Sequence, residues 1–242
     1  MRFKKVIKLF EKGCVSVFGM KGHGKDLLMS NVVTRRKLPY ISNIDYGGNF
    51  YPFDYASISC GSNKYTNFIS GDINSYEFPY PDGTEVYLSD AGIYFPAQYC
   101  NELNKLFPYM SVFQAISRHL GSAFHFNTQA LNRVWDKIRE QSEIYICCNG
   151  CLYLKGLVFQ KITVYDRYES AVQKVKPFRA PLPLFASTEM KLNRQLMKNQ
   201  FQAAHGEVHS HILIYVNKSK YNTRQFKEIL KEGKNAKASS SC

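Results

Sequence analysis

Short apolar runs alternate with stretches of helical periodicity along most of the chain. Apolar runs bounded by Gly, Pro or polar clusters predict strands, whereas apolar residues recurring every three or four positions predict helices. The predicted strands are 14–18, 40–44, 86–89, 123–128, 143–148 and 151–165, and the predicted helices are 24–36, 97–119 and 131–141. Strands alternating with helices indicate an α/β fold, in which a mostly parallel sheet is flanked by helices.

Three segments interrupt this alternation. Residues 45–85 are rich in Gly, Asn, Tyr, Ser and Pro and predict a long irregular insertion. Asn149-Gly150 separates two strand-like runs and predicts a β-hairpin. The Pro-rich run 177–186 predicts a boundary, followed by a small C-terminal extension with a helix near 188–204 and an apolar segment near 208–216.

These signals divide the chain into four parts. We expect an amphipathic basic N-terminal segment at 1–12, the main domain at 13–178, a C-terminal extension at 179–217, and a basic, largely disordered tail at 218–242. In the first segment, apolar residues at helical spacing alternate with lysines. Two interpretations stay open: a helix that caps the sheet, or a helix that lies on a membrane surface or partner.

Composition narrows the class of partner. The 242 residues are 45% hydrophobic, enough to bury a sizeable core, and carry a formal net charge of +13. That charge favours phosphate-rich partners, such as nucleotide, nucleic acid or an anionic membrane.

The cysteines indicate the cellular compartment. Seven cysteines with no paired spacing suit reduced thiols in a cytosol. We expect no signal peptide, and no transmembrane helix because no run of 18 apolar residues occurs.

The most informative motif follows the first predicted strand. Three glycines form a turn that leads through Lys25 into a helix, so backbone N–H groups and the helix N-terminus point at an anion. This is the phosphate-binding P-loop pattern, except that Asp26 stands where Ser or Thr is usual. The predicted phosphate-binding residues are Gly19, Met20, Lys21, Gly22, His23, Gly24, Lys25, Asp26 and Leu27.

Two further candidate residues follow predicted strands. Asp90 lies at a strand end downstream of the P-loop, where nucleotide hydrolases place a magnesium-binding or water-activating carboxylate. Gln129 closes the strand 123–128 and is positioned to contact a γ-phosphate or orient water. Ligands of parallel sheets bind at the carboxyl ends of strands, so we expect the P-loop, Asp90 and Gln129 to meet.

Cys148-x-x-Cys151 offers a competing interpretation as half of a zinc site. The other half would be His205, His209 and His211, far away in sequence and at unusual spacing. A hairpin that simply carries thiols explains the pattern with fewer assumptions.

Two blocks of the sequence carry a resemblance to a known family. The first is Phe18–Asp26, and the second is Leu88–Phe95, an apolar strand followed by Asp and a Gly-x-aromatic-Phe run. Both resemble the zonula occludens toxin-like ATPases, the assembly proteins of filamentous bacteriophages. Ser42–Asp45 is similar to the second strand of that family.

A third block extends the resemblance to about residues 14–165. Arg118-His119-Leu120-Gly121, the strand after it, Gln129 and Arg139 match an Arg-x-x-Gly turn, a strand, a Gln and a downstream Arg in that family. The resemblance implies a P-loop NTPase fold of the RecA/FtsK-HerA-like type that uses ATP and Mg²⁺. It further implies a homo-oligomeric motor for virion assembly that packages or exports viral single-stranded DNA from the host cytoplasm or the cytoplasmic face of the inner membrane.

The chain departs from the family at the metal-binding positions. Aligning Gly92 and Phe95 places Ser89 at the magnesium-binding Asp and Asp90 at the catalytic Glu. One hypothesis is an exchange, in which Asp26 supplies the carboxylate and Ser89 the hydroxyl to Mg²⁺, with Asp90 beside them. The rival alignment makes Asp90 the magnesium ligand and leaves Ala91 in the catalytic position, so that nucleotide binds but is hydrolysed poorly.

The resemblance also suggests roles for individual residues. Lys25 holds the β- and γ-phosphates, Asp90 positions or activates water, and Gln129 senses the γ-phosphate. Arg139 or Arg118 reaches the nucleotide of a neighbouring subunit. The missing membrane span is a further departure, because filamentous-phage relatives usually carry one; membrane contact would then use residues 1–12 or a partner. The alternative function is a non-hydrolysing nucleotide- or DNA-binding assembly scaffold with a degenerate P-loop.

Overall fold

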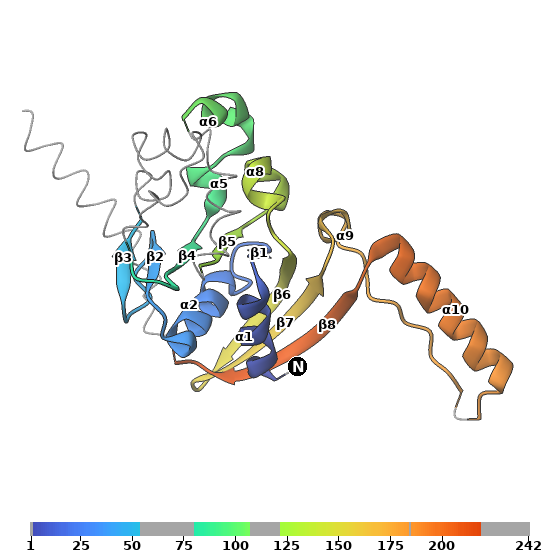
Figure 1. The fold of residues 1–242 in the computed structure, drawn as a ribbon. Helices are drawn as coiled ribbons and strands as arrows, with labels where there is room; N and C mark the ends of the chain where they lie inside the picture. Colours follow the sequence, from blue (N-terminus) through green and yellow to red (C-terminus); the bar gives the residue numbers. More distant parts are fainter. Residues whose placement is uncertain (1, 54–79, 107–121, 184, 219–242) are drawn as a thin grey trace, which may run out of the picture.

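The computed structural model describes residues 2–53, 80–106, 122–183 and 185–218 (Figure 1). Its centre is one eight-stranded sheet in the order β3-β2-β4-β5-β1-β6-β7-β8. The strands are β1 (Val15–Phe18), β2 (Tyr40–Ser42), β3 (Phe50–Pro52), β4 (Glu85–Leu88), β5 (Phe124–Thr128), β6 (Ile144–Leu154), β7 (Leu157–Tyr165) and β8 (Val208–Val216).

The sheet has a parallel part and an antiparallel part. Strands β3, β2, β4, β5, β1 and β6 pair in parallel, and β7 and β8 then add to β6 in antiparallel fashion. The predicted α/β fold with a mostly parallel sheet is therefore confirmed. Strand β8 falls in the predicted C-terminal extension but pairs along the whole of β7, so the extension returns to the same sheet.

Helices and apolar residues cover both faces of the sheet. The main helices are α1 (Phe3–Lys12), α2 (Lys25–Arg36), α5 (Ala91–Tyr94), α6 (Cys100–Leu106), α8 (Asp136–Arg139), α9 (Tyr168–Val172) and α10 (Thr188–His205). One core cluster joins α1 and α2 to β1, β6, β7 and β8, with Phe10, Leu28 and Ile146 fully buried. The other joins α5 and α9 to the opposite face, with Phe95 and Trp135 fully buried.

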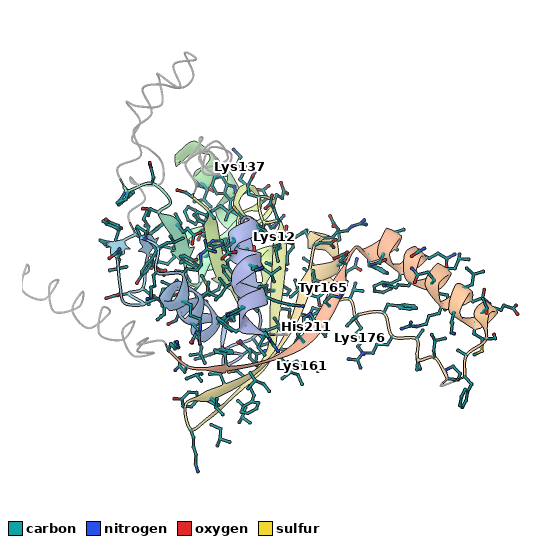
Figure 2. The ribbon with its side chains drawn as sticks, turned by 60° about the horizontal axis from the view of Figure 1, so that its bottom comes forward. Lys12, Lys137, Lys161, Tyr165, Lys176 and His211 are labelled. Atoms are coloured by element: carbon teal, nitrogen blue, oxygen red, sulfur yellow. The ribbon has the colours of Figure 1, made fainter. Side chains whose placement is uncertain are left out.

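Helix α1 packs against the sheet through its apolar side. Phe3, Val6 and Phe10 are buried, and the ring of Phe3 lies 4.5 Å from that of Tyr215 on β8. The lysines of α1 remain exposed; the last of them, Lys12, is labelled in Figure 2. Because the sheet occupies the apolar face of α1, the structure favours the capping helix over a helix lying on a membrane.

The predicted hairpin turn at Asn149-Gly150 is wrong. Strand β6 continues to Leu154, and the chain reverses at Lys155-Gly156, where both residues have positive φ (45° and 81°), as a type I′ turn requires. Asn149 and Gly150 instead form a β-bulge, marked by a register shift between Cys148 and Gly150. Asn149 Nδ2 donates to Thr163 Oγ1 at 2.9 Å, which holds the bulge against β7.

The single helix expected at 131–141 is also wrong. A 3-10 turn, η3 (Leu131–Arg133), and α8 are separated by Val134 and Trp135. Val134 forms an isolated antiparallel bridge with Pro96, and Trp135 N donates to Phe95 O at 2.8 Å. Burial of the Trp135 ring therefore overrides the local helical pattern.

Other predictions fall partly outside the described residues. Of the expected helix 97–119, the described part is helical as η2 (Ala97–Tyr99) and α6. Of the insertion 45–85, residues 50–52 form the edge strand β3, and residues 54–79 lie outside the described part. The helix predicted near 188–204 is present as α10, and the tail from 219 lies outside the described residues.

Helix α10 differs from the other long helices because none of its residues is buried. Figure 1 shows it standing clear of the sheet, with the segment that follows α9 running out alongside it. We call residues 176–183 and 185–205 the arm.

Candidate functional site

The P-loop connects the carboxyl end of β1 to the N-terminus of α2. Gly19 and Gly24 are required by space as well as by conformation. A Cβ on Gly19 would lie 2.3 Å from Cys148 O, and one on Gly24 would lie 2.9 Å from Cys151 Cβ. Both have positive φ, 148° and 77°. The loop is thus packed tightly against β6, while its crest at Met20, Lys21 and Gly22 is exposed.

Lys25 opens α2 and is almost fully buried, with 6% of its surface exposed. Its ammonium group donates to Met20 O at 3.3 Å, so the side chain curls back under the loop crest. The positive end of the α2 dipole lies at the same place. A phosphate group bound at the loop would therefore meet Lys25 and the backbone N–H groups together.

The antiparallel part of the sheet supports the loop from below. Gln160 on β7 is fully buried, and its Nε2 donates to His23 O at 3.1 Å and to Gly24 O at 2.9 Å. Tyr215 on β8 donates its hydroxyl to Gln160 Oε1 at 2.9 Å. His23 Nδ1 lies 2.8 Å from Cys148 O on β6. Together these bonds fix the direction in which the loop carbonyls, and hence the N–H groups, point.

Sequence reasoning missed Gln160 and Tyr215. Gln160 lies between Val158 and Ile162, two buried positions on the same face of β7. A polar residue in a row of buried apolar residues needs a hydrogen-bond partner. That signal was available, although the partner's identity depends on how β7 lies under the P-loop.

Asp26 and Ser89 meet at the edge of the sheet, although 63 residues separate them. Ser89 Oγ donates to Asp26 Oδ1 at 2.5 Å, and Asn127 Nδ2 donates to the same oxygen at 2.7 Å. Asn127 Nδ2 also lies 3.3 Å from Ser89 Oγ. The alignment with the family suggested Asp26 and Ser89 as a pair of magnesium ligands. It did not suggest Asn127, at the end of β5.

Asn43 fixes the backbone at Ser89. Its side-chain amide donates to Ser89 O at 2.9 Å and accepts from Ser89 N at 2.8 Å. Asn43 follows β2, the neighbour of β4 in the sheet. Consequently the ends of β2, β4 and β5 all contribute polar side chains to the surroundings of α2's first turn.

Asp90 follows Ser89 in an unusual backbone conformation. Its φ of 50° and ψ of 51° place it in the left-handed region, and its N–H donates to Asn127 Oδ1 at 3.0 Å. Partial burial raises the pKa of Asp90, and the nearby Asp26 carboxylate raises it further, while Lys25 acts in the opposite direction. A carboxyl group with a raised pKa beside a phosphate site suits proton acceptance from water.

Gln129 and Arg133 border a small cavity next to Asp90. The cavity has a volume of about 120 Å³ and is lined by Asp90, Gly92, Ile93, Thr128, Gln129 and Arg133. Gln129 is exposed at its rim. The predicted meeting of Asp90 and Gln129 is therefore seen in the structure, with Arg133 beside them.

Arg139 lies elsewhere. Its guanidinium carbon is 5.1 Å from the centre of the Tyr168 ring, and its Nη1 lies 3.4 Å from Val134 O. It does not line the cavity beside Asp90. Arg118 falls outside the described residues. A role for Arg139 or Arg118 at a neighbouring subunit's nucleotide stays a prediction.

The donor set beside the P-loop fits Mg²⁺. Asp26, Ser89 and Asp90 offer two carboxylates and a hydroxyl, and the pKa of Asp90 is raised in part by the charge of Asp26. A divalent cation would relieve that repulsion, and Mg²⁺ commonly takes one or two carboxylates plus waters and phosphate oxygens. In the described residues, no group of three or more His, Cys, Asp or Glu is arranged to hold a metal. The zinc interpretation of Cys148 and Cys151 therefore has no support there.

None of the described helices is both long and apolar enough to cross a lipid bilayer.

Comparisons with known proteins give structural neighbours only. Neither a protein-family model nor a curated protein matches the sequence. The fold is similar to the N-terminal domain of zonular occludens toxin from Neisseria meningitidis, with a TM-score of 0.44 and 12% identity over 89% of this chain and 97% of that one. It is also similar to the genome packaging NTPase B204 from Sulfolobus turreted icosahedral virus 2 in complex with AMPPCP, with a TM-score of 0.40, 15% identity, and coverage of 64% and 92%.

The crystal structure of B204, the DNA-packaging ATPase from Sulfolobus turreted icosahedral virus, is a further neighbour, with a TM-score of 0.38, 13% identity, and coverage of 69% of this chain and 98% of that one. Such scores describe shared architecture and carry no information on activity.

Proposed function

We propose that the protein is a magnesium-dependent ATPase that drives virion assembly by packaging or exporting single-stranded DNA. The observation that supports it best is the Asp26–Ser89 hydrogen bond, which joins the two residues of the proposed ligand exchange directly beside Lys25. A P-loop that had lost its function would have no need to keep these groups together at its helix N-terminus.

In this proposal the backbone N–H groups of Gly19–Gly24 bind the phosphates of ATP. Lys25 leaves Met20 O and pairs with the β- and γ-phosphates, which keeps its charge satisfied in a buried site. Asp26 and Ser89 hold Mg²⁺, which when bound neutralises charge on the phosphates. These residues bind and orient ATP before any water is activated.

Asp90 and Gln129 then act on water. Asp90 accepts the proton of the attacking water, helped by its raised pKa, and Gln129 orients that water or the γ-phosphate from the rim of the same cavity. Arg133 also lines this cavity and would meet negative charge that develops on the phosphate.

The basic surface is proposed to contact nucleic acid. The chain carries a net charge of +13, and the lysines of α1 face solvent beyond the docked apolar side. Those lysines suit single-stranded DNA or the cytoplasmic face of a host inner membrane as a peripheral contact. We further propose that the protein works as a homo-oligomer.

A non-hydrolysing scaffold is the second candidate. Two hydrogen bonds already occupy Asp26 Oδ1, and the rival alignment places Ala91, which is fully buried, at the catalytic position. Under that alternative the site binds nucleotide and releases it unchanged.

Magnesium-dependent ATP hydrolysis, measured with and without single-stranded DNA, tests the proposal. We expect DNA-stimulated turnover, and a loss of about 100-fold or more in Lys25→Ala, because a buried charge-assisted contact to the phosphates is removed. Lys198→Ala is the control, since Lys198 is an exposed lysine on α10 and belongs to no part of the proposed site. Binding of ATP without turnover would favour the scaffold, and absence of both would exclude a nucleotide-dependent role.

A further inference from the structure

An apolar surface lies on the antiparallel part of the sheet, on the face opposite α1. Three rows of paired residues make it: Leu154, Leu157 and Val216; Leu152, Phe159 and Ile214; and Gly150, Lys161 and Ile212. The apolar residues of these rows other than Phe159 are 40–62% exposed. We call this surface the outer face; Lys161, labelled in Figure 2, is the charged residue of the three rows.

The arm carries a second apolar surface. Leu192 and Leu196 lie one helical turn apart on α10 and are 63% and 52% exposed. The opposite side of α10 is already occupied within the arm. Arg194 Nε donates to Ala180 O at 2.6 Å, and the ring of Phe201 lies 5.8 Å from that of Phe178. The leucine side therefore faces away from the arm's own segment.

The arm cannot fold back onto its own sheet without breaking the hydrogen bonds that join the end of α10 to the residues around α9. Arg167 Nη1 donates to Ala203 O at 3.0 Å, Ser170 Oγ to His205 O at 2.6 Å, and Glu207 N to Asp166 Oδ1 at 2.8 Å. Gly206 is so close to the two residues between β7 and α9's first turn that a Cβ would lie 2.1 Å from Asp166 Oδ1. These contacts hold α10 in the projecting direction seen in both figures.

We propose that the arm of one copy binds the outer face of a second copy, with Leu192 and Leu196 against the rows of Ile212 and Ile214. The spacings agree. Leu192 and Leu196 lie four residues apart on a helix, about 6 Å along its axis, and Ile212 and Ile214 lie two residues apart on a strand, about 7 Å. Exposed apolar surfaces of this kind mark interaction sites.

The positions of the charged residues on α10 favour a protein as the partner of the leucines over an anionic surface. Arg194 and Lys198 lie two residues from Leu196, on the other side of the helix, so an anionic surface that met the leucines would miss the cations. On the leucine side, Glu189 lies one turn before Leu192 and is the charged residue there, flanked by amides. Glu189 would pair with Lys161 of the outer face when the arm docks.

The contact is head-to-tail, because the arm and the outer face are different surfaces of one chain. Such contacts repeat from copy to copy and build rings or longer chains. The inference goes beyond the proposed function, since it names the surfaces of association and does not require nucleotide.

Mixing two complementary variants tests it by sedimentation velocity without nucleotide. The first variant, Leu192→Glu/Leu196→Glu, disrupts the apolar surface of the arm. The second, Ile212→Glu/Ile214→Glu, disrupts the outer face. We expect the wild type to assemble and each variant to be monomeric, with its dissociation constant raised at least about 30-fold. A 1:1 mixture should form a heterodimer that does not grow. Lys198→Glu is the control on the far side of α10 and should assemble normally.

Three results would overturn the proposal: a monomeric wild type, wild-type assembly by either variant, or a mixture that stays monomeric. Circular dichroism checks that the variants are folded, and a charge swap gives an independent measurement. Glu189→Lys and Lys161→Glu should each weaken assembly, and the two together should restore it. Loss of binding to anionic phospholipid vesicles by the arm variant, with assembly intact, would assign the arm to a membrane instead. None of these results depends on Lys25 or on ATP turnover.

Discussion

The parallel and antiparallel parts of the sheet contribute to the site in different ways. In the parallel part, the ends of β1, β4 and β5 supply the groups that are proposed to touch phosphate, metal and water. In the antiparallel part, Gln160 lies beneath the loop and donates to two of its backbone carbonyls, and Tyr215 donates to Gln160. The proposed chemistry is therefore assigned to strand ends, whereas the geometry of the loop is held by residues inside strands.

This division predicts which substitutions should affect turnover alone and which should affect the structure of the P-loop. A change at a strand end of the parallel part should alter turnover with little effect on folding. A change in the antiparallel part should alter nucleotide affinity and stability together, because the P-loop rests on it.

Asp90→Asn should give the largest effect. We expect turnover to fall about 100-fold or more, because the proton acceptor is lost, while the backbone is kept since Asn tolerates the left-handed conformation. Asp82→Asn, at an exposed aspartate, is the control. Unchanged turnover in Asp90→Asn would show that Asp90 has no catalytic role.

The same variant has a predictable effect on stability. The folded-state pKa of Asp90 is raised, so its contribution to stability is present below the unfolded-state pKa and is lost as pH rises through the folded-state pKa. At pH 7 Asp90→Asn should therefore raise the free energy of unfolding, by about 0.5 kcal/mol because the group is partly exposed. The difference should vanish near pH 3 in denaturant titrations.

Gln160→Leu should weaken ATP binding about tenfold and lower the free energy of unfolding by about 1–3 kcal/mol, because two loop carbonyls and the Tyr215 hydroxyl lose a buried partner. Thr163→Val is the matched control. Thr163 is also on β7, and its hydroxyl bonds Ser210 and Asn149, away from the P-loop. It should lower stability without altering affinity, as measured by calorimetry. Equal affinities in the two variants would contradict a supporting role for Gln160.

The last prediction concerns the amino ends of the strands, far from the site, and involves stability alone. His125 on β5 is fully buried, and its Nδ1 accepts from Val15 N at 3.2 Å. Burial lowers the pKa of His125; the adjacent Glu85 acts against this, and Arg36 adds to it. Because the folded-state pKa is depressed, this contribution to stability is present above the unfolded-state pKa and is lost as pH falls through the folded-state pKa.

His125→Gln should consequently flatten the stability profile between about pH 7 and 5, with a change of about 1 kcal/mol. Glu85 does not contribute to the pH dependence between about pH 7 and 5. Burial favours a higher pKa for Glu85, but His125, Arg36 and Tyr87 bring it below the ordinary value, so its own loss occurs at lower pH. A profile as steep as that of the wild type would assign the pH dependence to another group.

Much of the parallel part was predictable because its signals are local. Glycine spacing pointed to the P-loop, and the rule that ligands bind at strand carboxyl ends predicted Asp90 near it and Gln129 near Asp90. Asn127 and Asn43 were not predictable in the same way. Their partners, Asp26 and Ser89, depend on which strands are neighbours, and the family blocks that contain Asn43 and Asn127 give neither residue a role.

The antiparallel part resisted prediction for the same physical reason. Asn149-Gly150 has strong turn propensity, yet β6 and β7 pair through to Leu154 and Leu157, and the bulge absorbs the Asn-Gly pair. Likewise the helical periodicity of 131–141 gave way to burial of Trp135 against Phe95, whose ring centres lie 6.3 Å apart. In both places tertiary packing decided between locally acceptable alternatives.

The exchange of metal ligands between Asp26 and Ser89 is the claim that most needs testing. The most direct measurement is nucleotide affinity with and without Mg²⁺ in Asp26→Ser, Ser89→Asp and the double variant. We expect each single change to reduce the magnesium-dependent gain in affinity about tenfold or more. The double variant should recover it, because one carboxylate and one hydroxyl are again present. If Asp26→Ser keeps the full magnesium-dependent affinity, the exchange is wrong.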